Sequence, residues 1–211
     1  MSGVAGFTRD VATAAAALRR GQLVVYPTET FYGLGALASL PEALARLAAA
    51  KLRPEGKPLP LVAADLDMAF ALWDAVPEEA RRLAERFWPG PLTLVAAAAS
   101  GLPAALVLGG AVGVRVPGLA LARELARLAG GPLVSTSANP AGGVSPSSSA
   151  GLAPALLARI DLVLDGGPTP GGLPSTVVEV RPSGARLLRE GAVPWSEIET
   201  SLRSPLPSSG R

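Results

Sequence analysis

Short runs of apolar and β-branched residues alternate along this chain with Ala- and Leu-rich segments of helical periodicity, and glycines and prolines separate the segments. Helices are predicted at about residues 11–20, 41–53, 119–128 and 150–158, after Pro77 and near Ser196. Strands are predicted at about residues 23–26, 59–62, 93–97, 112–116, 133–135, 161–164, 176–180 and 185–188. Helices and strands alternate before strands dominate. We therefore expect an α/β fold, a twisted mixed sheet with flanking helices.

The length of 211 residues suits one large domain with a buried core. We expect a single domain over residues 1–203 and a disordered Pro/Ser-rich tail over residues 204–211. Residues 91–114 carry no charge, but prolines and glycines interrupt them, so we predict two buried strands there and no membrane span. No basic region of a signal peptide precedes the first helix. A cytoplasmic location is therefore expected.

The chain contains neither cysteine nor histidine. This composition excludes disulfides, zinc–thiolate sites, cysteine nucleophiles and Ser-His-Asp catalysis. Catalysis would have to use arginine, lysine, hydroxyls, carboxylates, backbone amides or a bound metal. The net charge of +2 is too small to indicate general nucleic-acid binding.

The lysines are concentrated in one place. The chain has 17 arginines but only two lysines, Lys51 and Lys57, and both lie in a seven-residue segment with Arg53. An ammonium group combined with a planar guanidinium suits the binding of a polyphosphate. Basic residues are also common at solvated helix ends. Both interpretations stay open on the local sequence.

Three further segments combine strand ends with small polar residues. Residues 26–35 and 135–140 are rich in hydroxyl groups and follow predicted strands, where such groups can bind phosphate or sugar oxygens. Residues 165–176 form a long Gly/Pro-rich loop, which is typical of a lid or of a ligand-lining segment. Each segment could equally be an ordinary turn or surface loop.

Two arginines stand out by position. Arg115 lies inside an apolar strand, where a guanidinium needs an anionic partner, either a structural carboxylate or a substrate carboxylate. Arg189 lies at a strand end, where a surface ion pair is the usual explanation.

Eight segments in a fixed order resemble the YrdC-type threonylcarbamoyl-adenylate synthase family, and the resemblance covers about residues 8–195. The segments are YPTETFYGLG, KLRPEGKPLPLV, WPGPLTLV, VGVRVP, STSAN, DLVLDGG, STVVEV and LLREG. The resemblance implies a single-domain YrdC-like fold around a deep basic cavity. The implied reaction joins L-threonine with bicarbonate or CO2 as a carbamate, which attacks the α-phosphate of ATP and expels pyrophosphate. A downstream threonylcarbamoyl-transferase complex would then modify the tRNA adenosine beside the anticodon, and direct tRNA contact is a further expectation.

The resemblance also implies roles for individual residues. A family K-x-R pair and S-x-N pair fall on Lys51, Arg53, Ser137 and Asn139, which should contact the ATP phosphates and the carbamate. The nucleotide contacts are Lys57, Ser145 and Arg189, and the residues lining the threonine pocket are Thr30, Arg115, Ser135 and Ser175. No protein metal ligand is implied, but Mg²⁺ is expected to share the pyrophosphate charge. Val62 stands where some members have a histidine.

Two other functions compete with this one. A module that binds double-stranded RNA or tRNA without catalysis would use the same basic cavity, but aromatic residues make up only 4% of the chain. A carbamoyl-transfer module of hydrogenase maturation usually belongs to a longer chain with cysteine motifs, which this sequence lacks.

Overall fold

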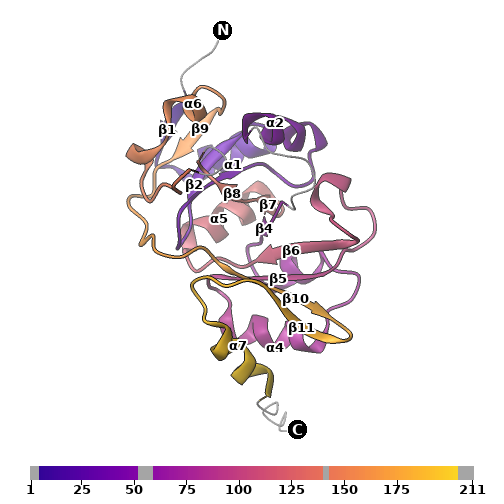
Figure 1. The fold of residues 1–211 in the computed structure, drawn as a ribbon. Coiled ribbons are helices and arrows are strands. Elements are labelled where there is room, and N and C mark those ends of the chain that lie inside the picture. Colours follow the sequence, from indigo (N-terminus) through magenta and orange to yellow (C-terminus); the bar gives the residue numbers. More distant parts are fainter. Residues whose placement is uncertain (1–4, 52–58, 140–142, 204–211) are drawn as a thin grey trace.

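The computed structural model describes residues 5–51, 59–139 and 143–203. Within these residues the α/β class is confirmed, and the strands are divided between two mixed sheets rather than gathered in one. Figure 1 shows the first sheet in the half of the molecule that holds the N-terminus and the second sheet in the half that holds the C-terminus. A cavity lies where the two sheets meet, and residues of both sheets line it.

The first sheet has five strands in the order β1-β9-β2-β3-β8. Their bounds are Gly6–Thr8 for β1, Leu162–Leu164 for β9, Val24–Pro27 for β2, Tyr32–Gly35 for β3 and Thr136–Ser137 for β8. Strands β1, β9 and β2 are parallel, whereas β3 pairs antiparallel with both β2 and β8. Strands β2 and β3 are buried along their whole length.

The second sheet has six strands in the order β11-β10-β5-β6-β4-β7. Their bounds are Gly184–Arg189 for β11, Thr176–Arg181 for β10, Leu92–Ala97 for β5, Ala111–Arg115 for β6, Leu61–Val62 for β4 and Leu133–Val134 for β7. The β10–β5 and β6–β4 pairs are parallel, and the other three pairs are antiparallel. Residue Ser135 alone separates β7 in this sheet from β8 in the first sheet.

Seven α-helices flank the sheets within the described residues. They are α1 at Val11–Arg19, α2 at Pro41–Lys51, α3 at Leu66–Phe70, α4 at Glu78–Phe87, α5 at Ala120–Ala129, α6 at Pro154–Leu157 and α7 at Trp195–Arg203. Asp10 caps α1 by accepting from the amides of Ala12 and Thr13, and α5 ends at Gly130, which has a φ of 82°. Helices α1 and α5 pack on each other, and α4 packs on β5 and α7.

Several local predictions differ from the structure. No strand was predicted at residues 32–35, which belong to a segment interpreted either as ligand-binding or as an ordinary connection, but they form β3, the second strand of a hairpin with β2. Residues 150–158 were predicted as one helix and instead contain a 3₁₀ turn at Ser149–Gly151 followed by the four-residue α6. The predicted end of α2 near Arg53 lies outside the described residues, as does the predicted tail at residues 204–211.

Gly35 illustrates how tightly the β2–β3 hairpin is packed. A Cβ atom at this position would lie 2.5 Å from Cε1 of Tyr26 and 3.1 Å from the carbonyl oxygen of Val134. Because Tyr26 is fully buried, its ring cannot move away without disturbing the core.

We therefore expect Gly35→Ala to lower the free energy of unfolding by about 1–3 kcal/mol. Denaturant-induced unfolding measures this loss. Gly131→Ala is the matched control, because its new methyl group would meet only Cδ1 of Leu37, at an ordinary 3.5 Å. Equal stability of the Gly35→Ala protein and the wild type would contradict the packing described.

Candidate functional site

A cavity of about 610 Å³ lies between the two sheets. Its walls come from β3 and the turn before it, from the segment around β7 and β8, and from one face of the second sheet. Four arginines and one glutamate line it, namely Arg115, Arg181, Arg186, Arg189 and Glu179. The other polar side chains of the lining are hydroxyl groups, those of Thr28, Thr30, Thr93, Ser135, Thr136, Ser137, Ser145 and Ser175.

Lys51 lies beside this cavity and binds the turn at Ser137–Asn139. It is the last residue of α2 and is buried, and its ammonium Nζ donates to the carbonyl oxygens of Ser137 (2.5 Å) and Asn139 (2.6 Å) and to Oδ1 of Asn139 (3.0 Å). Ser137 Oγ also donates to Asn139 Oδ1, at 2.5 Å. Lys51 therefore fixes the shape of the Ser137–Asn139 turn, and its positive charge lies directly behind a hydroxyl group that faces the cavity.

Arg115 has a structural partner inside the protein. Its Nη1 atom lies 3.1 Å from Oε1 of Glu29, and the exposed fractions of the two side chains are only 9% and 17%. The second carboxylate oxygen, Oε2 of Glu29, is buried and has no hydrogen-bond partner within the described residues. Of the two partners that the sequence left open, the structure therefore supplies the structural carboxylate. Arg115 also lines the cavity.

Ser175 and Arg189 form a second polar group on the opposite wall. Nη2 of Arg189 donates to the carbonyl oxygen of Ser175 at 2.7 Å and to its Oγ at 3.3 Å, and this Oγ lies 2.9 Å from Oγ1 of Thr93. Desolvation lowers the pKa of Arg189, and repulsion from Arg115 lowers it further. None of the ion pairs among the described residues includes Arg189. Two guanidinium groups thus act on one cavity, which favours an anionic ligand.

The turn before β3 supplies the hydroxyl groups of a third wall. Oγ1 of Thr30 lies 3.0 Å from Oγ1 of Thr28, and the carbonyl oxygen of Thr30 accepts from Thr169 Oγ1 (3.0 Å) and from the amide of Gly171 (3.0 Å). The loop at residues 165–176 is therefore attached to this turn. The structure favours a ligand-lining role for the loop, since Pro174 and Ser175 at its end face the cavity.

The sequence pattern of the Sua5/YciO/YrdC family, which is described as "Telomere recombination", matches residues 16–191. The chain belongs to the Sua5/YciO/YrdC family. All three walls of the cavity lie within the matched residues.

Relatives in this family carry informative names. The chain is 42% identical to a threonylcarbamoyl-AMP synthase of Pyrococcus abyssi over 88% of its own length, but it spans only 55% of that relative. It is 35% identical to a putative threonylcarbamoyl-AMP synthase of Mycobacterium tuberculosis, over 92% of this chain and 90% of the relative. The structure of Pyrococcus abyssi Sua5 complexed with L-threonine superposes with a TM-score of 0.85 at 37% identity, covering 95% of this chain and 60% of that one.

The residues that the family resemblance singled out are brought together in part. Those that line the cavity are Thr30, Arg115, Ser135, Ser137, Ser145, Ser175 and Arg189. Lys51 and Asn139 lie directly behind Ser137. Arg53 and Lys57 lie outside the described residues.

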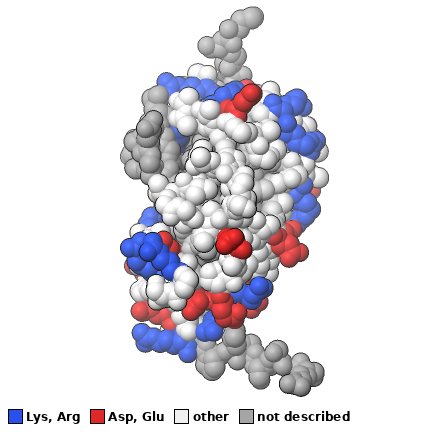
Figure 2. Space-filling view, turned by 90° about the vertical axis from the view of Figure 1, so that its right-hand side faces the viewer, with Lys and Arg blue, Asp and Glu red and all other residues white. Residues whose placement is uncertain are grey.

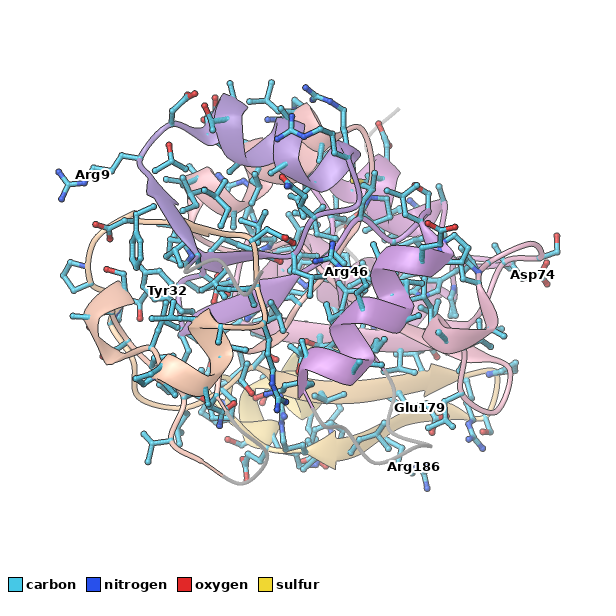
Figure 3. The ribbon with its side chains drawn as sticks, turned by 90° about the horizontal axis from the view of Figure 1, so that it is seen from above. Arg9, Tyr32, Arg46, Asp74, Glu179 and Arg186 are labelled. Atoms are coloured by element: carbon cyan, nitrogen blue, oxygen red, sulfur yellow. The ribbon has the colours of Figure 1, made fainter. Side chains whose placement is uncertain are left out.

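Sequence reasoning missed one polar cluster, Glu179 with Arg181 and Arg186. Oε1 of Glu179 lies 2.6 Å from Nη2 of Arg181, and Oε2 lies 2.9 Å from Nη2 of Arg186. Figure 3 shows Glu179 and Arg186 close together on the β10–β11 hairpin. Burial alone would raise the pKa of Glu179, but hydrogen bonds from Arg181 and Arg186, together with their charges, lower it below its ordinary value. A charged residue on the same strand face as Ser175 was the available signal.

Other features of the described residues bear on function only weakly. A second hollow of about 470 Å³ lies between α4 and α7, and it contains no residue for which the sequence suggested chemistry. No helix in the described ranges is long and apolar enough to cross a membrane.

Proposed function

We propose that this protein is an L-threonylcarbamoyladenylate synthase, which makes threonylcarbamoyl-AMP and pyrophosphate from L-threonine, bicarbonate and ATP. The observation that carries the proposal is that several polar groups meet at one cavity. They are the Ser137–Asn139 turn bound by Lys51, the guanidinium groups of Arg115 and Arg189, and the surrounding hydroxyl groups. The names of the relatives and the threonine complex of the Pyrococcus abyssi Sua5 support it.

The reaction needs no nucleophile from the protein. The amino group of threonine takes up CO2 to form a carbamate, whose oxygen attacks the α-phosphorus of ATP while the bond to the pyrophosphate oxygen breaks. Such a reaction requires two anions to be held together and the charge on the leaving pyrophosphate to be neutralised. In our proposal Lys51, Ser137 and Asn139 act on the phosphates, and Arg115 binds the threonine carboxylate. This division of roles suits a chain without cysteine or histidine.

The remaining positions take supporting roles in the same scheme. Arg189 and Ser145 contact the nucleotide, and Thr30, Ser135 and Ser175 orient the threonine through their hydroxyl or backbone groups. Tyr26, whose pKa burial raises to about 12, stays protonated next to Ser135 and adds no charge to this pocket. Arg53 joins Lys51 in contacting the ATP phosphates and the carbamate, and Lys57 contacts the nucleotide.

The proposal includes a Mg²⁺ ion that binds together with the nucleotide. The described residues contain no group of three or more acidic side chains that could hold a metal ion. Protein sites for Mg²⁺ commonly use substrate phosphates and water in addition to one or two carboxylates. The ion would thus bind together with ATP and neutralise the leaving pyrophosphate. The protein would not need to supply a complete set of metal ligands.

The product would pass to a threonylcarbamoyl-transferase complex that modifies tRNA, and this transfer would take place in the cytoplasm. Direct tRNA binding is a separate part of the proposal. On the face drawn in Figure 2 the arginines and lysines lie around the margin among acidic residues and form no continuous basic surface. Neither a non-catalytic RNA-binding module nor a carbamoyl-transfer maturation module is favoured, because the named relatives are synthases.

The purified protein is expected to release pyrophosphate from ATP only when threonine and bicarbonate are both present. A coupled pyrophosphate assay with each substrate omitted in turn measures this dependence. Turnover without threonine would refute the proposed activity. Activity with carbamoyl phosphate in place of threonine and bicarbonate would favour the maturation module, and salt-sensitive RNA binding without pyrophosphate release would favour the RNA-binding module.

A further inference from the structure

The hydroxyl group of Thr169 lies between two segments that are far apart in the sequence. Its Oγ1 atom is 3.0 Å from the carbonyl oxygen of Thr30 and 3.2 Å from the carbonyl oxygen of Ser147, and it can donate to either. Thr30 belongs to the turn before β3, whereas Ser147 belongs to the segment that follows β8. Thr169 itself belongs to the loop at residues 165–176. One side chain therefore brings three segments together.

Each of these three segments contributes a residue to the cavity. They contribute Thr30 from the turn, Ser145 from the segment after β8 and Ser175 from the end of the loop. Thr30 and Ser175 are assigned to threonine in the proposed function, and Ser145 is assigned to the nucleotide. Thr169 therefore connects groups that would contact different substrates.

Backbone amides of the loop donate to the same two carbonyl oxygens. The amide of Thr169 donates to Ser147 at 2.7 Å, and the amide of Gly171 donates to Thr30 at 3.0 Å. A threonine hydroxyl has a single hydrogen, so Thr169 can donate fully to only one of the two carbonyls at a time. A small movement of either segment therefore changes which of the two bonds the hydroxyl makes.

Hydrogen bonds rather than apolar packing hold the loop in place. Within the part of the chain that the structure describes, no residue from 165 to 175 belongs to the hydrophobic core, and Leu173 is 61% exposed. Segments with few buried apolar contacts open at a low cost in free energy. A ligand that orders such a loop loses binding free energy to the ordering, and a second ligand that finds the loop already ordered loses less.

We propose that Thr169 is a positioning residue that couples the threonine subsite to the nucleotide subsite, so that each substrate strengthens the binding of the other. Threonine orders the turn and the end of the loop, and the hydroxyl of Thr169 extends this order to the segment that carries Ser145. Linkage requires the nucleotide to strengthen threonine binding by the same factor. This inference rests on the proposed function, because that function assigns the two subsites.

The test measures the Kd for threonine by calorimetric titration, first alone and then with saturating α,β-methylene-ATP, which cannot release pyrophosphate. In the wild type the nucleotide analogue is expected to lower this Kd by about fivefold or more, as is typical of coupled sites. In Thr169→Val, which has nearly the same shape but no hydroxyl, the ratio of the two Kd values should fall below about twofold. Thr169→Ser keeps the hydroxyl and should keep the coupling. A general loosening of the loop would weaken threonine binding equally in both titrations, so the ratio distinguishes coupling from a merely structural role.

Thr200→Val provides the matched control. Oγ1 of Thr200 also donates to a backbone carbonyl, that of Ser196 at 2.8 Å, and it lies on α7 outside the cavity, so its loss should leave the ratio unchanged. Thr169→Ala is a second hydroxyl-free variant and replaces Thr169→Val if that protein does not fold.

Three results would overturn the inference and leave the synthase proposal standing. They are a wild type without coupling, a hydroxyl-free variant with the coupling of the wild type, and a Thr169→Ser protein that is as uncoupled as Thr169→Val. A wild type that binds neither threonine nor the nucleotide analogue would overturn the synthase proposal itself, and the inference with it.

Discussion

Replacing Lys51 with alanine is expected to reduce threonine-dependent pyrophosphate release by at least about a hundredfold, the effect typical of removing one preorganised electrostatic contact from an active site. The physical reason is that the ammonium group has two functions. It supplies positive charge next to the proposed phosphate site, and it binds the carbonyl oxygens of Ser137 and Asn139, which fix the turn. Both functions are lost together in the alanine variant.

A second variant distinguishes the loss of the ammonium group from a general loss of folding. Lys51→Met keeps most of the buried stem but lacks the charge, and it should be nearly as inactive as Lys51→Ala if the ammonium group is what matters. Arg46→Ala is the control on the same helix, because Arg46 pairs with Asp161 and does not line the cavity. Near-normal turnover in a folded Lys51→Met protein would show that the site has been assigned wrongly.

Replacing Arg115 with methionine is expected to lower the free energy of unfolding by about 3 kcal/mol, because it leaves the largely buried Glu29 carboxylate, whose side chain is only 17% exposed, without its counterion. The same change should raise the KM for threonine strongly if Arg115 binds the threonine carboxylate. Denaturant titration and steady-state kinetics measure the two effects independently.

The double variant Arg115→Met with Glu29→Gln tests whether the two effects have different causes. Removing the unpaired charge should restore part of the lost stability, since a neutral amide costs less to bury than a carboxylate. Threonine binding should remain impaired, because the guanidinium group is still absent. A double variant that regains threonine affinity would rule out the proposed contact, and one that regains no stability would rule out the described ion pair as the source of the loss.

The strands with apolar periodicity could be predicted from the sequence, and those defined by tertiary pairing could not. Leu92–Ala97 and Thr176–Arg181 are long enough to show their apolar character, and their predicted bounds are within one residue of the observed ones. Tyr32–Gly35 was missed because it contains two glycines and is buried on both faces, so no alternation marks it. Thr136–Ser137 has only two residues, and its pairing with β3 joins segments about a hundred residues apart.

The same distinction applies to the candidate site. The turn at Ser137–Asn139 and the lone Arg115 could be picked out because their residue types are unusual for their local surroundings. The partner of Arg115 could not be predicted, because Glu29 lies 86 residues away and only the fold brings the two together. The cluster of Glu179, Arg181 and Arg186 depends on the register of the β10–β11 hairpin, including its irregularity between Val177 and Val178.

Strand β7 leads directly into β8 through Ser135, and this connection affects how small molecules enter and leave the cavity. Each of the two sheets contributes a wall, and a single peptide unit on either side of Ser135 ties these walls together at that edge. They cannot be drawn apart there without breaking strand pairs in both sheets. We expect small molecules to enter and leave the cavity on the side away from Ser135, near Leu108 and the β10–β11 hairpin. The side at Ser135 is expected to stay closed.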